Sequence, residues 1–120
     1  MATLSLDLLG WLYISLSGVS AAAGHLLVKK SRLNPGDPGL ASLVFSPWFL
    51  GAIVFYLLNI ILLAKALDRA PVSVAYPAIN GINFLVLVLG AALIFGEALA
   101  WRQYLGLGAI MLGVYLVGQV

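Results

Sequence analysis

The sequence contains no cysteine, so the chain can form neither disulfide bonds nor a thiolate redox site. Charged residues are also scarce, at 8% of the 120 residues, whereas about 25% is usual in soluble domains. A chain with so few charges and with 63% hydrophobic residues is poorly suited to a water-facing surface. The composition therefore indicates an integral membrane protein that forms a single membrane domain over residues 1–120.

Acidic residues are missing from the long apolar runs, because all four Asp and Glu residues lie outside them. Membrane carboxylates are the usual proton relays and cation sites, so their absence argues against proton-driven cation transport. The chain also lacks a glycine-rich phosphate loop, a recognisable nucleophile–base pair and a metal-binding cluster of His or Cys. We therefore predict that it is not an enzyme and binds no cofactor or metal. A scattered net charge of +2 does not suggest nucleic acid as a partner.

Four apolar runs approach the length of about 20 residues that a helix needs to cross a bilayer. They cover approximately residues 8–28, 47–67, 72–95 and 101–120, and the connections between them are short. The predicted fold is therefore all-α, a membrane bundle of four antiparallel transmembrane helices. Ala21–Ala23 resembles a signal-peptide cleavage site, but Asp7 stands where a signal peptide would be basic, so we expect a retained first span.

Basic residues slightly favour one side of the predicted bundle. The first and third loops carry four of them, Lys29, Lys30, Arg32 and Arg102, and the other side carries Lys65 and Arg69. The positive-inside rule would place the first and third loops in the cytoplasm and both termini outside. A margin this small leaves room for insertion in either orientation.

Assembly into pairs is expected, because four helices are too few to line a transport path. Two copies, or two homologous subunits, one inverted relative to the other, would supply the missing half. Gly106, Ala109 and Gly113 form a small-residue seam that lets helices approach closely, and this seam is the predicted contact between chains. A similar stripe in the first span, which includes Ser17 and Gly24, is interpreted as packing.

The third span carries a group of polar residues inside an apolar run. Tyr76, Asn80 and Asn83 are spaced i, i+4 and i+7, so they share one helical face. An amide in hydrocarbon is costly without a partner or water, so this face should point into the protein. It is either the wall of a substrate path or a seam of interhelical hydrogen bonds. Pro77 and Gly81 would let this helix bend.

Four other polar residues lie in or next to the predicted spans. His25 and Lys29 share one helical face near a loop, where they could bind an anionic head group. In the alternative interpretation, His25 is bonded to a neighbouring residue and the Lys29 side chain extends to the membrane interface. Asn59 lies near the middle of the second span and needs a partner, which favours packing over ligand binding. Glu97 follows the third span and is expected to help end that helix.

Segments along nearly the whole chain resemble the drug/metabolite transporter superfamily in its four-helix form. The similar segments are Ala23–Lys29, Pro71–Pro77, Asn80, Asn83–Phe84, Glu97 and the seam from Gly106 to Val114. This resemblance implies a small transporter of the bacterial inner membrane that works as a dimer or with a paired homologous subunit.

Two branches of that superfamily are similar to this chain. The small multidrug resistance family exchanges protons for cationic drugs and matches at Tyr76, but its first-helix Glu falls at Ala21 here. The aminoarabinose–undecaprenyl phosphate flippase subunits and related small lipid-linked sugar transporters fit better. Their first-helix Ala-Gly-Gln…Lys pattern and third-helix Tyr-Pro…Asn…Asn-Phe pattern match here, except that His25 replaces Gln.

We therefore interpret the sequence as a flippase that moves a polyprenyl-phosphate-linked sugar, or a similar amphiphile, between leaflets. Tyr76, Asn80 and Asn83 would hydrogen-bond the sugar, while Lys29, with His25, would bind the phosphate. A proton-coupled exporter of organic cations and a non-transporting partner subunit of a larger membrane complex are the alternatives.

Overall fold

The protein is represented by a computed structural model, which describes residues 8–33 and 40–117. Every regular element in these two ranges is a helix. The helices are α1 (Leu8–Ser31), α2 (Leu40–Val44), α3 (Pro47–Leu67), α4 (Val72–Ile94) and α5 (Trp101–Val117). Three of them, α1, α3 and α4, are long and apolar enough to cross a membrane. The predicted all-α membrane fold is confirmed for these three spans.

The last helix, α5, coincides with the fourth predicted span over its 17 described residues. A crossing helix needs about 20 residues, and the predicted span extended to residue 120. Residues 118–120 lie outside the described part of the chain. That α5 crosses the membrane, and that two chains pair, therefore stay predictions.

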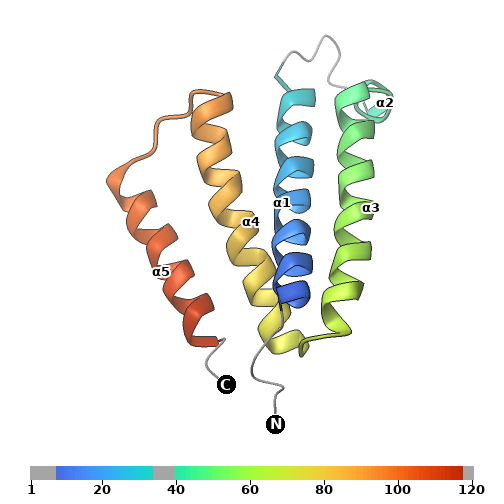
Figure 1. Ribbon diagram of the computed structural model, residues 1–120. Helices are drawn as coiled ribbons and strands as arrows, with labels where there is room; N and C mark the ends of the chain where they lie inside the picture. Colours follow the sequence, from blue (N-terminus) through green and yellow to red (C-terminus); the bar gives the residue numbers. More distant parts are fainter. Residues whose placement is uncertain (1–7, 34–39, 118–120) are drawn as a thin grey trace.

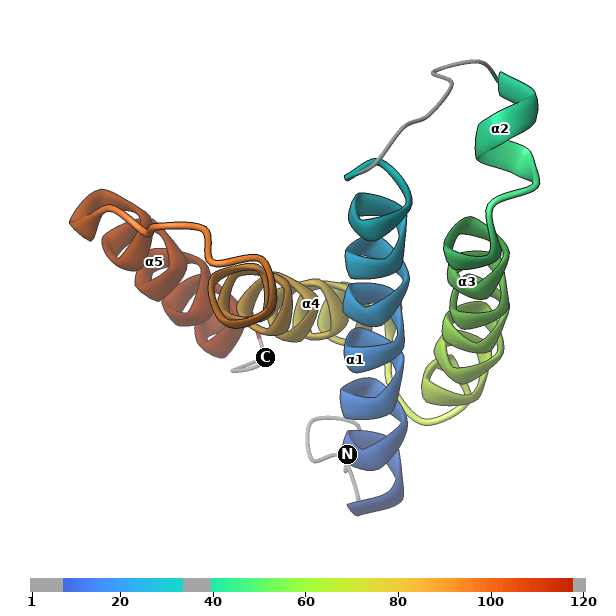
Figure 2. The same ribbon diagram turned by 90° about the horizontal axis from the view of Figure 1, so that it is seen from above.

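The four long helices lie side by side in the order α5, α4, α1, α3 (Figures 1 and 2). The first helix of the chain, α1, is thus central, with α3 packed on one side and α4 on the other. By contrast, α5 is at the edge and packs on α4, with Leu107 as its one buried residue among those described. The most exposed long helix is therefore the one that carries the predicted seam between chains.

Small residues explain why α1 can take the central position. Its buried residues are Gly10, Ile14, Ser17, Gly18, Ser20, Ala21, Ala22 and Gly24. A Cβ added at Gly24 would lie 2.6 Å from the Tyr56 ring, and one added at Gly18 would lie 2.7 Å from the Ile82 side chain. Both neighbouring helices therefore approach α1 to distances that a side chain at these glycines would prevent. The packing interpretation of the α1 stripe is confirmed.

The amide of Asn59 has the partner that its depth in the second span requires. Ser17, which is fully buried on α1, donates a hydrogen bond from its Oγ to the Asn59 Oδ1 over 2.6 Å. The same Oγ lies 3.2 Å from the Asn59 backbone oxygen. This pair joins α1 to α3 and agrees with the packing role that the sequence favoured for Asn59.

Ser17→Ala is expected to destabilise the bundle by about 1 kcal/mol, because it leaves the Asn59 oxygen without its donor. Ser20→Ala is the matched control, since Ser20 is also buried on α1 and has no hydrogen-bond partner among the described residues. Unfolding in mixed micelles, titrated with a denaturing detergent, measures both variants. Equal stability of the two would show that the hydrogen bond contributes nothing.

Candidate functional site

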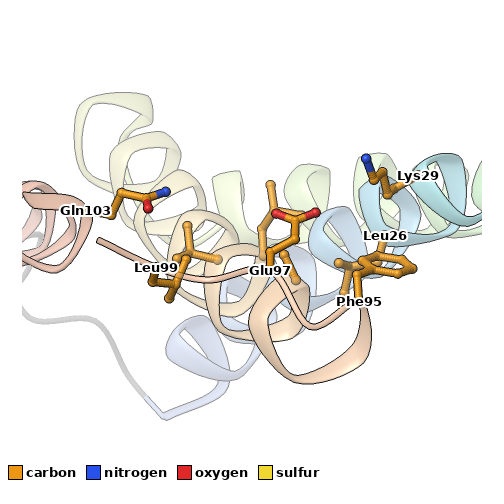
Figure 3. Close-up of a pocket in the computed structure, with 9 residues that line it drawn as sticks. Leu26, Lys29, Phe95, Glu97, Leu99 and Gln103 are labelled. Atoms are coloured by element: carbon orange, nitrogen blue, oxygen red, sulfur yellow. The ribbon is translucent and has the colours of Figure 1, made fainter. Parts of the chain in front are cut away.

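A pocket of about 250 Å³ lies at the end of the bundle where α1 and α4 finish and the connection to α5 begins (Figure 3). We call it the Lys29–Glu97 pocket. It is lined by Leu26, Lys29, Leu87, Val88, Ala91, Phe95, Glu97, Leu99 and Gln103. Six of these nine side chains are apolar and three are polar, so the pocket has the character of an amphiphile site.

The three polar side chains come from three different parts of the chain. Lys29 is on α1, Glu97 follows α4 and Gln103 lies in the first turn of α5. In the view of Figure 3 Gln103 and Leu99 lie at one end, Lys29 lies with Leu26 and Phe95 at the other end, and Glu97 lies between them. An ammonium, a carboxylate and an amide therefore line one small space together with apolar side chains.

A left-handed glycine positions Glu97. Gly96 has φ = 67°, a conformation that costs glycine little because it has no Cβ. The chain reverses there, and the Glu97 N–H donates to the Ala91 carbonyl over 3.4 Å. The helix end is thus formed by backbone groups. This leaves the Glu97 carboxylate free of the capping role that the sequence assigned to the residue.

Gln103 performs the capping role for the following helix. Its Oε1 accepts a hydrogen bond from the Ala100 N–H over 2.8 Å, as the third residue of a capping box does. This bond holds the amide at the pocket, and the NH2 group has no protein partner among the described residues. Gln103 therefore offers donors to a bound molecule.

Lys29 and Lys30, which are adjacent on α1, have different neighbours. Lys30 places its Nζ 4.8 Å from the centroid of the Trp48 ring of α3, a cation–π contact. Lys29 instead lines the pocket. Within the described ranges, neither the Lys29 ammonium nor the Glu97 carboxylate has an ion-pair or hydrogen-bond partner. The pocket therefore holds two opposite charges that remain available to a ligand.

His25 lies next to α3. Its Nδ1 is 2.8 Å from the Tyr56 hydroxyl, and the two rings are 5.3 Å apart between centroids. His25 does not line the Lys29–Glu97 pocket. The structure therefore agrees with the interpretation in which His25 is bonded to a neighbouring residue, here Tyr56. It does not place His25 in the same pocket as Lys29.

The polar face of α4 lies apart from this pocket. Tyr76 is half exposed, Asn80 is half buried, and Asn83 is 5% exposed. The Asn83 Oδ1 is buried without a hydrogen-bond partner among the described residues. Asn83 shares a helical face with Gly90, where an added Cβ would meet Leu26 of α1, so this face points toward α1. Of the five predicted binding residues, Lys29 lines the Lys29–Glu97 pocket.

A second, apolar hollow of about 350 Å³ adjoins the Lys29–Glu97 pocket along α4 and α5. We call it the α4–α5 groove. It is lined by Phe84, Leu87, Val88, Gln103, Gly106, Leu107 and Ile110, so three of its residues also line the first pocket. A pocket that contains two charged side chains thus continues into an apolar groove, which suits a molecule with a charged head and a hydrocarbon tail.

The predicted seam on α5 is unoccupied within one chain. Gly106 and Ala109 are exposed, and a Cβ added at Gly106 or Gly113 would meet no atom of the described residues within 4 Å. Gly106 also lies in the α4–α5 groove. That the seam contacts a second chain stays a prediction.

Sequence reasoning missed two residues of the pocket, Glu97 and Gln103. One signal could have found Glu97. In an antiparallel bundle the first and third spans end on the same side, which brings Lys29 and Glu97 to the same level. Gln103 follows at the start of the next helix, but its contact with the pocket depends on how α5 packs.

Comparison with known proteins gives the family. The family described as Small Multidrug Resistance protein matches residues 9–110. The protein y4nH of Sinorhizobium fredii is 35% identical over 104 residues, covering 86% of this chain and 89% of the relative.

Two flippase subunits match over shorter stretches. Both are called probable 4-amino-4-deoxy-L-arabinose-phosphoundecaprenol flippase subunit ArnE. The one from Aeromonas salmonicida is 36% identical over 75 residues, covering 62% of this chain and 65% of the relative. The one from Yersinia pestis is 39% identical over 70 residues, 58% of this chain and 60% of the relative. No solved structure matches the chain. The chain belongs to the small multidrug resistance protein family.

Proposed function

We propose that this protein moves a polyprenyl-phosphate-linked sugar, or a similar amphiphile, between the leaflets of the bacterial inner membrane. One observation carries the proposal: the charged Lys29–Glu97 pocket continues into the apolar α4–α5 groove. The head group of such a lipid needs polar contacts, while its tail needs only contact with apolar surface. The names of the ArnE relatives support this substrate class.

Lys29 binds the phosphate of the lipid in this proposal. A lysine ammonium is a compact charge that serves well in phosphate sites. Lys29 has no ion-pair partner among the described residues, so binding a phosphate breaks no existing contact. The tail lies along the α4–α5 groove and continues into the bilayer.

The polar face of α4 provides the path for the sugar across the membrane. Tyr76, Asn80 and Asn83 hydrogen-bond its hydroxyl groups in turn, and the buried Asn83 oxygen becomes accessible when α1 and α4 separate. Pro77 and Gly81 let α4 bend. A Cβ added at Gly81 would lie 2.6 Å from the Val114 side chain, so a bend there would move α5 as well.

A second chain completes the path. A copy of this protein, or a homologous subunit, packs on the exposed face of α5 through Gly106, Ala109 and Gly113. In this arrangement α5 is the fourth transmembrane helix. Rocking of one bundle against the other then exposes the path to alternate sides.

Export of organic cations is the second candidate, because the family match supports it. The observation against it is at Ala21, where the resemblance places the family's carboxylate. Ala21 is 6% exposed in the packed interior and has no titratable group. Coupling to protons would then need a carboxylate from elsewhere.

The deciding experiment measures lipid translocation in proteoliposomes with protein purified together with any chain that accompanies it. Wild-type protein is expected to flip a polyprenyl-phosphate sugar faster than empty vesicles do. Lys29→Ala should slow flipping about fivefold, the effect of about 1 kcal/mol per basic residue near an anionic group. Lys30→Ala is the matched control, because its ammonium contacts Trp48 instead, and it should stay within twofold of wild type, roughly the limit for a weak surface charge.

Two outcomes would overturn the proposal. Proton-coupled uptake of a quaternary ammonium compound, without lipid flipping, would establish the cation exporter. A stoichiometric unlike chain that transports without this protein would make it a partner subunit. Equal rates for the Lys29 and Lys30 variants would remove Lys29 from the site.

A further inference from the structure

We propose that α1 and α3 move as one rigid unit during transport, while α4, with α5 packed on it, pivots away from α1. The separation begins at the end of the bundle that carries the Lys29–Glu97 pocket, and it uncovers Asn83. This inference rests on the proposed function and specifies which contact between helices opens. Its basis is the difference between the contacts that α1 makes on its two sides.

Polar contacts join α1 to α3 at three levels of the bundle. Two are hydrogen bonds, over 2.6 Å and 2.8 Å, and the third is a cation–π contact over 4.8 Å. The pairs are Ser17 with Asn59, His25 with Tyr56, and Lys30 with Trp48. Because lipid is as apolar as the side chains it meets, helices in a membrane associate through such polar contacts and through close packing. Separating α1 from α3 would break all three contacts.

The side of α1 that faces α4 has no such polar contact. From Ile14 to Ser31, no side chain of α1 is hydrogen-bonded or ion-paired to α4 within the described residues. On the α4 side, the Asn83 Oδ1 is buried with no partner in the described part of the chain. An unsatisfied buried polar group disfavours the packed state, and separation gives it access to water or to a ligand. Of these two contacts of α1, the one with α4 is therefore the easier to open.

The contact between α1 and α4 is tighter at one end than at the other. A Cβ added at Gly18 would lie 2.8 Å from Ile82 Cβ and 2.9 Å from the Ile79 backbone oxygen, so the two backbones are close there. For a Cβ added at Gly90, the three nearest atoms all belong to the Leu26 side chain, the closest at 2.8 Å. Figures 1 and 2 show that α4 lies against α1 where α4 begins and diverges from it toward the pocket. Separation therefore starts at the pocket end.

A buried cluster at the opposite end provides the pivot. Its members come from α1, from the end of α3 and the turn after it, and from the first half of α4: Ile14, Ala66, Ala70, Ala75, Ala78 and Ile79. Small side chains let the three helices approach closely here. Pro77 lies between members of the cluster and removes a backbone hydrogen bond within α4. The part of α4 beyond Pro77 can therefore tilt while its beginning stays in place.

The Lys29–Glu97 pocket lies across the contact that opens. Leu26 and Lys29 belong to α1, whereas the other lining residues belong to α4, to α5 and to the connection between them. Pivoting of α4 therefore moves one wall of the pocket away from the other. A head group bound at Lys29 then gains access to Asn83 and the polar face of α4.

The test locks each side of α1 in turn with a disulfide, against a background free of native cysteine. Leu26→Cys with Gly90→Cys locks α1 to α4, because a Cβ at Gly90 would lie 3.8 Å from Leu26 Cγ. The matched control is Leu27→Cys with Gly51→Cys, which locks α1 to α3. A Cβ at Gly51 would lie 3.4 Å from Leu27 Cδ1. Electrophoresis without reductant measures the fraction of protein bridged within one chain.

Each oxidised protein is compared with the same protein after reduction in the lipid-flipping assay, so that any effect of the substitutions themselves cancels. The bridge between α1 and α4 should lower flipping to the rate of empty vesicles, and reduction should restore it. The bridge between α1 and α3 should leave the rate unchanged. Equal rates for the two oxidised proteins, or an α1–α4 pair that does not oxidise, would overturn the proposal.

Thiol labelling tests the opening without transport. Ser17 and Asn83 are both buried, so Ser17→Cys places a thiol in the contact that stays closed and Asn83→Cys places one in the contact that opens. In liposomes, N-ethylmaleimide should label Asn83→Cys and leave Ser17→Cys unlabelled, because a minor open state is enough for slow labelling. Equal labelling of the two would contradict the proposal. If wild-type protein flips no lipid, the proposed function fails, and this labelling alone decides whether α4 separates from α1.

Discussion

Gly18→Leu is expected to destabilise the bundle by about 3 kcal/mol, the upper part of the range for overpacked interiors. A Cβ at Gly18 would lie 2.7 Å from Ile82 Cγ2 and 2.9 Å from the Ile79 carbonyl oxygen. The Ile82 side chain could move aside, but the carbonyl belongs to the α4 backbone. Leucine therefore forces α1 and α4 apart along their whole contact.

The control for this substitution is Gly108→Leu on α5, where an added Cβ would meet no atom within 4 Å in the part of the chain that the structure describes. It should change the stability little, and leucine's better helix propensity could raise it by about 0.8 kcal/mol. Denaturing-detergent titration in micelles measures both variants. A Gly18→Leu protein as stable as Gly108→Leu would show that α1 does not pack on α4 as the structure has it.

Asn83→Leu is expected to change stability and transport in opposite directions. The Asn83 Oδ1 is buried with no partner among the residues described, and an unsatisfied buried polar group costs about 1–3 kcal/mol. Leucine removes that cost, so the free energy of unfolding should rise by a similar amount. Flipping should become about two- to tenfold slower, because the proposed hydrogen bond to the sugar is lost.

Asn59→Leu is the matched control, since it makes the same change at an amide that has a partner. It breaks the bond from Ser17 and should destabilise the protein. The same micelle titration and flipping assay apply to both variants. Destabilisation by Asn83→Leu of the size seen for Asn59→Leu would mean that the Asn83 oxygen is hydrogen-bonded in the membrane. Unchanged flipping would remove Asn83 from the proposed path.

These two asparagines show how far sequence reasoning reaches in an apolar chain. Hydropathy places both inside spans and implies that each needs a partner. It does not say which of them has one. Asn59 meets Ser17, because both face the contact between α1 and α3. Asn83 faces the α1–α4 contact instead, and within the described part of the chain no donor lies opposite its oxygen. The difference depends on helix rotation, which a periodic pattern leaves undetermined when nearly every residue is apolar.

The same limit of sequence reasoning applies to Glu97 and His25 at the candidate site. Glu97 follows a span, so its sequence position suggested a role in ending the helix, but Gly96 and backbone groups end α4 instead. His25 and Lys29 share a face by spacing, yet His25 contacts Tyr56 on α3 and Lys29 lines the pocket. Two long side chains on one helical face can therefore contact different neighbouring elements.

The sequence by itself determined the membrane class, the presence of three apolar spans and the close packing of α1, because hydrophobicity, length and side-chain size are properties of each segment alone. Only the tertiary structure decided which charges share a space. The Lys29–Glu97 pocket and the α4–α5 groove arise where α1, α4 and α5 meet, and that meeting depends on contacts between residues about 70 positions apart. No local pattern encodes such contacts, since they form only when the helices pack.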